Sequence, residues 1–208
     1  LLRRTAPCGE GLREFSNYCK FRQNGLATAD PVAAGIKFSS FLRADSFLIT
    51  RDFAPLTALE DIVLKRPTSL QGHQNQQKKN NILRAIGRYA RRMHDSGMNQ
   101  KDFNATHILL QNLEDKNPQV ALFDLQRMDH NPLNRFRWPI KALAELNYTL
   151  PPAIFSENDR IFLFSAYKGK ENLSLFDRWQ YRMIGQKTEK IARHTQKRGL
   201  APKMTGLE

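Results

Sequence analysis

The sequence predicts an α+β fold in two parts, and three observations indicate it. Residues 1–53 combine a helical run with extended stretches, whereas most of residues 54–198 have helical periodicity. Two short apolar runs on either side of a polar turn predict a β-hairpin inside the second part. One aspartate, Asp102, stands before this hairpin, and another, Asp124, stands after it. The sequence therefore predicts a small hairpin with two carboxylates, set into a mostly helical region.

The first part begins with a predicted helix over residues 11–21. Its apolar residues recur every three positions: Leu12, Phe15, Tyr18 and Phe21. Extended stretches follow at residues 31–34, which end at Gly35, and at residues 47–50. One helix followed by two strands is therefore expected before residue 54.

The second part begins with a short predicted helix over residues 56–63. Residues 66–79 are rich in Gln and Asn, and apart from Leu70 they lack apolar residues, so we interpret them as a surface linker. A longer helix is predicted over residues 80–94, with Gly97 as its stop signal. Its apolar face consists of Ile82, Leu83, Ile86, Tyr89, Ala90 and Met93.

The hairpin and three further helices complete the prediction. The hairpin strands are expected at residues 108–110 and 120–123. A helix then ends at Leu150, and a capping sequence that starts at Ser156 begins another helix, which ends at Tyr167. Residues 174–198 predict a long terminal helix.

The two aspartates flank the hairpin as they do in enzymes that transfer phosphoryl groups. In kinases, a loop Asp accepts the proton of the attacking hydroxyl, a residue five positions later binds metal, and an Asp after the hairpin holds Mg²⁺. Here Asp102, His107 and Asp124 occupy these positions. Taken singly, Asp102 is better explained as a turn cap and Asp124 as a strand end. Both together, at this spacing and behind this helix, favour the kinase interpretation.

Several short segments, spread over most of the chain, extend this interpretation to a family. They are residues 13–15, 46–50, 59–61, 93–94, 97–99, 101–103, 107–110, 123–127, 137–138 and 141–143. In these segments, and in their order, the sequence resembles the bacterial lipopolysaccharide core kinases, which are heptose and Kdo kinases of the WaaP type and their InaA-like relatives. The resemblance implies a two-lobed, protein-kinase-like fold, ATP and Mg²⁺ as cofactors, and a sugar of the lipopolysaccharide inner core as acceptor.

The resemblance also implies roles for the residues around the hairpin. Asp102 would be the catalytic base, and Lys101 beside it would steady the transferring phosphate. Asp124 and His107 would hold the metal, and His107 in place of Asn is itself typical of the family.

Nucleotide-binding residues are expected in the first part. Residues 50–53 would form the hinge whose backbone reads adenine, so Thr50, Arg51 and Asp52 are candidate cofactor-binding residues. Glu14 is the candidate for the helix Glu that pairs with a strand Lys. No Lys precedes it, and the alternative is an ordinary solvated helix charge.

The kinase interpretation divides the chain into three ranges. Residues 1–53 would be a partial N-lobe, residues 54–198 a helical C-lobe, and residues 199–208 a disordered tail. The basic residues before Glu14 are Arg3 and Arg4, and no glycine-rich strand precedes it. We therefore expect part of the N-lobe to be missing before Leu1.

Two positions, Gln100 and Ala142, depart from the family pattern, and Gln126 differs from protein kinases. Gln100 replaces the usual His before the catalytic loop, which puts the rigidity of the loop in doubt. Gln126 stands where a protein kinase has the Gly of its Asp-Phe-Gly turn. Ala142 replaces an Asp that would anchor the catalytic loop. Ala142, Gln100 and the missing parts of the N-lobe leave a catalytically weak or silent kinase-like protein as the alternative function.

The charge of the chain requires an anionic partner. The 208 residues carry a formal net charge of +13, and 40% of them are hydrophobic, as in an ordinary globular protein. The terminal helix is basic and amphipathic, which suits the anionic inner-membrane surface, although a core-packed helix with a solvated basic face is the simpler explanation. The acceptor, a lipopolysaccharide core glycolipid, is presented at that surface. Peripheral attachment to its cytoplasmic side is therefore expected.

Other classes of function receive little support. The chain contains no motif of nucleic-acid binding, so no nucleic-acid partner is expected. The histidines show no zinc-ligand spacing, and Cys8 and Cys19 form no disulfide or metal pattern, which indicates a reducing, cytoplasmic setting. No apolar run approaches the ~20 residues needed to cross a bilayer.

Overall fold

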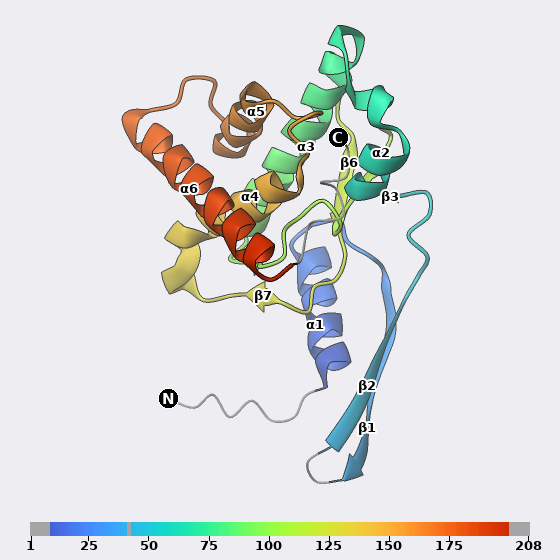
Figure 1. Cartoon of the computed structure of the whole chain (residues 1–208). Helices are drawn as coiled ribbons and strands as arrows, with labels where there is room; N and C mark the ends of the chain where they lie inside the picture. Colours follow the sequence, from blue (N-terminus) through green and yellow to red (C-terminus); the bar gives the residue numbers. More distant parts are fainter. Residues whose placement is uncertain (1–8, 41–42, 200–208) are drawn as a thin grey trace.

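The computed structural model describes residues 9–40 and 43–199, and these form a mixed α+β fold. Helix α1 (Glu10–Gln23) and two long strands lie at one end of the molecule, while α3 to α6 gather at the other end (Figure 1). Arg3, Arg4, Cys8 and the predicted tail from residue 200 onward lie outside the described residues.

The first two strands form an antiparallel ribbon against α1. Strand β1 (Pro31–Ser40) pairs with β2 (Arg43–Thr50). Helix α1 contacts both strands, and the side chains of Tyr18 and Phe21 are buried at its inner face. The predicted helix and both predicted strands are confirmed, and the strands are longer than expected.

The segment predicted as a surface linker is folded. It contains two 3₁₀ turns, η1 (Pro67–Leu70) and η2 (His73–Asn75), and the first residues of α3 (Gln76–Asp95). The prediction of a linker was wrong because Lys79 and Gln76 bond to the buried Asp159. Lys79 Nζ lies 2.8 Å from Asp159 Oδ2, and both side chains are less than 10% exposed. Leu70 is fully buried in the core.

Two small sheets position the residues around the hairpin. Strands β5 (Ile108–Gln111) and β6 (Gln119–Leu122) form the predicted hairpin. Strand β3 (Thr57–Ala58), which directly precedes α2 (Leu59–Lys65) in the chain, pairs with β5. Strands β4 (Asn99–Gln100) and β7 (Met128–Asp129) pair antiparallel. The second pairing draws the segment before Asp102 against the segment that follows Asp124.

The helices of the second part pack in two pairs. Helix α3 lies against α5 (Glu157–Lys168), and α4 (Trp138–Thr149) lies against α6 (Leu175–Lys197), with the 3₁₀ helix η3 (Pro132–Arg137) leading into α4. The predicted start of α5 is confirmed by a capping box at Ser156. A Cβ at Gly87 would lie 2.8 Å from the carbonyl oxygen of Leu163, so only glycine allows α3 and α5 to approach this closely.

Among the helices that the structure describes, none is both long enough and apolar enough to span a membrane.

A buried histidine joins α3 to two other elements. His94 Nε2 lies 3.0 Å from Asn99 Oδ1 of β4, and Nδ1 lies 3.0 Å from the Tyr167 hydroxyl of α5. An imidazole that donates from Nε2 and accepts at Nδ1 satisfies both partners. Burial lowers the pKa of His94 from 6.5 to about 4, so the folded protein holds this ring neutral.

The burial of His94 predicts a loss of stability in acid. Between pH 6.5 and about 4, the unfolded chain binds a proton at His94 that the folded protein does not bind. The free energy of unfolding should therefore fall as the pH falls through this range, by up to about 3 kcal/mol. Urea unfolding at pH 7 and pH 4.5 measures this loss. The loss should be smaller in His94→Gln than in the control His73→Gln, which changes an exposed histidine, and equal losses would contradict this account.

Candidate active site

The hairpin and its flanking loops bring Asp102, His107 and Asp124 together. His107 Nδ1 lies 2.9 Å from the backbone carbonyl oxygen of Asp102, and Nε2 lies 3.5 Å from Asp124 Oδ2. Because a carbonyl oxygen only accepts, Nδ1 carries the proton in the neutral ring and donates it to Asp102 O. The lone pair of Nε2 then faces the Asp124 carboxylate. His107 therefore links the two predicted carboxylate positions.

Asp124 is held in a backbone conformation that few residues other than glycine adopt. Its φ angle is +56°, in the left-handed region. Its backbone N–H donates to the Tyr18 hydroxyl over 2.9 Å. Strained non-glycine residues of this kind cluster at functional sites. Here the conformation of Asp124 changes the direction of the chain shortly after β6.

Side chains on one face of α1 form hydrogen bonds with the backbone of residues 124–125. Glu14 Oε1 accepts from the Leu125 N–H over 3.1 Å, and Asn17 Nδ2 donates to the Leu125 carbonyl over 2.7 Å. With Tyr18, these residues stand three and four positions apart, so they share a face of the helix. Sequence reasoning missed Asn17 and Tyr18. The signal that could have found them is this run of polar groups on the buried side of α1.

Glu14 is buried rather than solvated, so the alternative of an ordinary surface charge was wrong. It is 6% exposed. Burial raises its pKa, and hydrogen bonds from Gln126, the Leu125 N–H and Tyr18 oppose that rise. Within residues 9–40 and 43–199, no Lys or Arg pairs with Glu14. Its partners are instead in the Asp124–Gln126 segment.

Gln100, which replaces the expected His, bonds to the segment that carries Asp124. Its side chain is fully buried, and its amide Nε2 donates to the backbone carbonyl of Asp124. The Lys101 N–H donates to the Arg127 carbonyl over 3.1 Å. Both bonds join the loop that carries Asp102 to the loop that carries Asp124. An amide thus supplies the donor that links the two loops.

Helix α4 holds the loop that carries Asp102 without an Asp at position 142. Ala142 is buried, but the hydroxyl of Thr149, at the end of the same helix, accepts from the Ala105 N–H over 3.0 Å. The Ala105 carbonyl accepts from the Glu60 N–H over 3.0 Å. The loop is therefore fixed from two sides by residues that the sequence did not indicate.

Of the two cations near Asp102 in the sequence and the fold, Arg127 contacts its carboxylate and Lys101 does not. Arg127 Nη1 lies 2.7 Å from Asp102 Oδ1, and the other carboxylate oxygen accepts no hydrogen bond from a described residue. Lys101 is exposed and lies near Asp129 instead. Burial favours the neutral form of Asp129, but hydrogen bonds from Asn131, Asn134 and Trp138, together with the Lys101 charge, lower its pKa. Arg127, rather than Lys101, is the cation in contact with Asp102.

The predicted hinge residues lie beside the site, and their side chains have local partners. Thr50 ends β2, and Arg51 Nε lies 3.1 Å from Asp30 Oδ2. The Arg51 N–H donates to the Asp30 carbonyl over 2.8 Å, and Asp52 Oδ1 accepts from the Ala54 N–H over 3.2 Å.

An aromatic contact connects this segment to the hairpin. The ring centroids of Phe53 and Phe123 are 5.1 Å apart, and those of Phe123 and His107 are 5.5 Å apart. Phe53, which ends this segment, therefore packs against the residue that precedes Asp124.

The donor set around Asp124 fits a divalent cation that a nucleotide brings with it. Mg²⁺ is commonly held by one or two carboxylates, with phosphates and water filling its other positions. Asp124 offers a half-exposed carboxylate, and the His107 lone pair facing it at 3.5 Å leaves two acceptors that a cation between them would satisfy. No group of three or more acidic, His or Cys residues suited to a metal occurs in the described part of the chain. A carboxylate and an imidazole would leave most positions around Mg²⁺ to phosphate and water.

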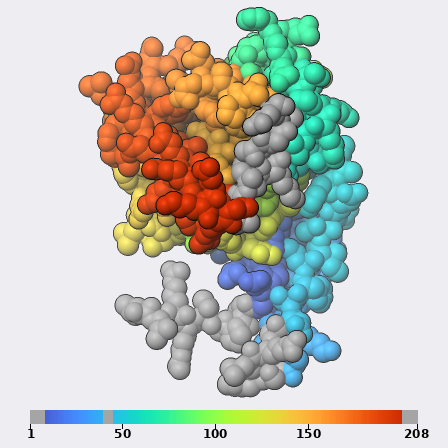
Figure 2. Space-filling model, viewed as in Figure 1, coloured from blue at the N-terminus to red at the C-terminus, as the bar shows by residue number. Residues whose placement is uncertain are grey.

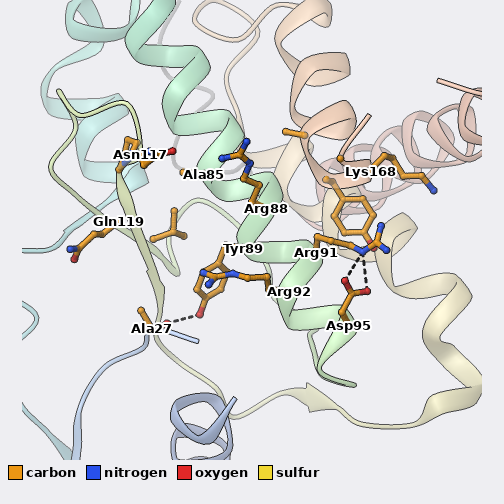
Figure 3. Close-up of a pocket in the computed structure, with 15 residues that line it drawn as sticks. Ala27, Ala85, Arg88, Tyr89, Arg91, Arg92, Asp95, Asn117, Gln119 and Lys168 are labelled. Atoms are coloured by element: carbon orange, nitrogen blue, oxygen red, sulfur yellow. Dashed lines mark hydrogen bonds and ion pairs between the residues drawn. The ribbon is translucent and has the colours of Figure 1, made fainter. Parts of the chain in front are cut away.

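A separate basic cavity lies away from these residues. It has a volume of about 670 Å³ and is bordered by α3, the end of α5 and the β5–β6 turn (Figure 3). Arg88, Arg91, Arg92 and Lys168 line it. Arg91 is already paired with Asp95, with N–O distances of 2.7 and 2.9 Å. The cavity contains none of the predicted site residues.

Known proteins similar to this chain are lipopolysaccharide kinases. Residues 1–167 match the model of the "Lipopolysaccharide kinase (Kdo/WaaP) family". Among curated proteins, the chain is similar to the lipopolysaccharide core heptose(I) kinase WaaP of Escherichia coli, with 27% identity over 66% of this chain and 52% of the relative. It is also similar to WaaP of Pseudomonas aeruginosa, with 25% identity over 80% of this chain and 62% of the relative.

A third relative and a solved structure extend the comparison. WaaP of Escherichia coli strain K12 is 26% identical over 90% of this chain and 72% of the relative. The structure of WaaP in complex with acyl carrier protein superimposes with a TM-score of 0.67 and 22% identity, and covers 90% of this chain and 76% of that one. This likeness shows a shared fold. The chain spans only about half to three quarters of the length of the relatives it matches.

Proposed function

The chain belongs to the lipopolysaccharide kinase (Kdo/WaaP) family, and we propose that it transfers phosphate from ATP to a heptose or Kdo sugar of the lipopolysaccharide inner core. The observation that carries this proposal is the contact of His107 with both Asp102 and Asp124. Curated relatives are lipopolysaccharide core heptose(I) kinases, which favours heptose as the first acceptor to test.

Asp102 acts as the general base of this reaction. Its free oxygen accepts the proton of the sugar hydroxyl, while Arg127 occupies Oδ1 and fixes the carboxylate. Phosphoryl transfer needs mainly positioning and neutralisation of charge. The bonds from Gln100 and Thr149 supply positioning, because they hold the loop that carries Asp102.

Asp124 and His107 would hold Mg²⁺, which when bound neutralises charge on the transferred phosphate. Asp124 supplies the harder, better-suited ligand. Hydrogen bonds with the side chains of Glu14, Asn17 and Tyr18 hold the backbone of Asp124 and Leu125 in place. Glu14 contributes to nucleotide binding indirectly, through its hydrogen bond with the Leu125 N–H. Lys101 provides an exposed positive charge near the acceptor.

The nucleotide binds between two lobes in this proposal. Residues 1–53 belong to the smaller lobe and residues 54–198 to the larger one, with Thr50, Arg51 and Asp52 at the hinge. The carbonyl of Arg51, whose N–H is occupied by Asp30, is the group that would accept from adenine. The protein works on the cytoplasmic side of the inner membrane, where the glycolipid acceptor and the anionic surface are available to its basic helix α6.

Phosphorylation of purified core lipopolysaccharide by the full-length protein tests the function. With labelled ATP and Mg²⁺, we expect label in the glycan, and acceptors ending in heptose or in Kdo distinguish the sugar. ATP binding without any transfer would favour the alternative, a catalytically silent kinase-like protein in which Ala142 does matter. The absence of both binding and transfer would contradict either function.

A further inference from the structure

Three exposed aromatic rings lie together where η3 and α6 meet, and each of these two elements also carries an exposed leucine. The rings of Phe136, Phe176 and Trp179 are 51%, 54% and 45% exposed, and Leu133 and Leu175 are 87% and 85% exposed. The three ring centroids lie 5.6 to 6.1 Å from one another. We call these five residues the aromatic face. The two elements that carry it, η3 and α6, lie side by side at the left of Figure 1 and Figure 2.

Cations border the aromatic face on the side of α4. A groove of about 530 Å³ is lined by Phe136 and Trp179 together with Arg137, Lys141, Lys187 and Lys190, and no carboxylate lines it. Lys168, which lies 6.0 Å from the centroid of the Phe176 ring, is already paired with Asp177 over 2.8 Å, so the available cations are those of the groove. Half-exposed aromatic rings next to Lys and Arg are the combination found where proteins meet the interface of an anionic membrane.

The groove beside the aromatic face lies between α4 and α6. Helix α4 also contacts the loop that carries Asp102, because the Thr149 hydroxyl at its end accepts from the Ala105 N–H over 3.0 Å. The groove and this loop are therefore connected through one helix.

We propose that the aromatic face, with the cations of its groove, docks the protein onto the anionic headgroup surface of a lipid bilayer. This inference rests on the proposed function only for the identity of the acceptor, which is itself anchored in a membrane. Charge complementarity and the protruding Leu133 and Leu175 side chains favour a bilayer, because apolar tips can enter the acyl boundary while cations remain among the headgroups.

Tryptophan fluorescence of the full-length protein tests the contact without altering the face. Trp138 is fully buried, whereas Trp179 is 45% exposed, so a bilayer should change only the signal of Trp179. With vesicles that contain phosphatidylglycerol, we expect a blue shift of emission and quenching by lipids brominated in the acyl chain. Phosphatidylcholine vesicles should produce neither. Trp179→Phe should abolish the signal but retain co-sedimentation, and a response that persists in this variant would overturn the proposal.

Paired variants locate the binding energy. Phe136→Ser/Phe176→Ser and, separately, Lys187→Glu/Lys190→Glu should each weaken co-sedimentation with anionic vesicles at least tenfold, and added salt should weaken wild-type binding. The controls are Ile161→Ser, at an exposed apolar residue of α5, and Arg66→Glu/Lys116→Glu, which makes the same change of charge elsewhere. Unchanged binding by Phe136→Ser/Phe176→Ser would overturn the proposal.

A water-soluble, deacylated core oligosaccharide separates docking from chemistry. Phe136→Ser/Phe176→Ser should phosphorylate this soluble acceptor at the wild-type rate and the membrane-bound acceptor more slowly. If the wild-type protein binds vesicles but phosphorylates neither acceptor, the proposed function fails and the docking face stands. If the aromatic face instead captures an acidic protein, such as an acyl carrier protein, and the protein binds no vesicles, the docking proposal fails.

Discussion

Replacing Asp102 by alanine is expected to reduce phosphate transfer by a factor of about a hundred to ten thousand, with the fold intact. A general base contributes a rate factor of this size. The side chain of Asp102 makes no bond that holds secondary elements together except its contact with the exposed Arg127. His107 bonds to the backbone carbonyl of Asp102 rather than to its carboxylate, so that link survives the substitution.

The measurement is the single-turnover rate of glycan phosphorylation at saturating ATP. The matched control is Asp115→Ala, which removes an exposed carboxylate from the turn between β5 and β6. The control should transfer at the wild-type rate, and both variants should bind ATP and unfold at the same urea concentration as the wild type. Appreciable transfer by Asp102→Ala would contradict the assignment of the base.

Replacing Lys79 by methionine is expected to cost about 3–5 kcal/mol of stability, because it leaves a buried carboxylate without its cation. Asp159 is 3% exposed, and Lys79 Nζ lies 2.8 Å from it and 3.0 Å from the Ile154 carbonyl. The remaining hydrogen bonds that Asp159 accepts, from Gln76 and Ser156, do not replace the lost positive charge.

Urea unfolding of two further variants isolates this effect. Lys78→Met removes the neighbouring lysine, whose partner Glu114 is 81% exposed, and should cost less than about 1 kcal/mol. In the double variant Lys79→Met/Asp159→Asn, no buried charge remains, so part of the lost stability should return. Equal costs for Lys78→Met and Lys79→Met would refute the importance of burial.

The elements that the sequence predicted well are those with strong local patterns. Apolar periodicity located α3, the alternation of apolar runs and a turn located the hairpin, and the capping residues at Ser156 located the start of α5. The spacing of Asp102, His107 and Asp124 depends on the same hairpin, so the sequence also indicated that these three would meet.

The elements that the sequence did not predict depend on partners that are distant along the chain. Residues 66–79 are mostly polar, but Lys79 forms a buried ion pair with Asp159, which lies 80 positions later. Gln100 was interpreted as a weakness, although its amide reaches the carbonyl of Asp124. Asn17 and Tyr18 reach residues more than 100 positions away. Local composition carries no information about such contacts.

The central claim is that Asp102, His107 and Asp124 form one centre for Mg²⁺-dependent phosphoryl transfer. The most direct test is the rate of glycan phosphorylation from ATP as a function of Mg²⁺ concentration, in the wild type and in Asp124→Asn. Our account predicts that the wild-type rate saturates with Mg²⁺, and that Asp124→Asn, which weakens the carboxylate ligand but keeps its shape, loses nearly all transfer at the same concentration. Transfer by Asp124→Asn at the wild-type rate and with the wild-type dependence on Mg²⁺ would contradict it.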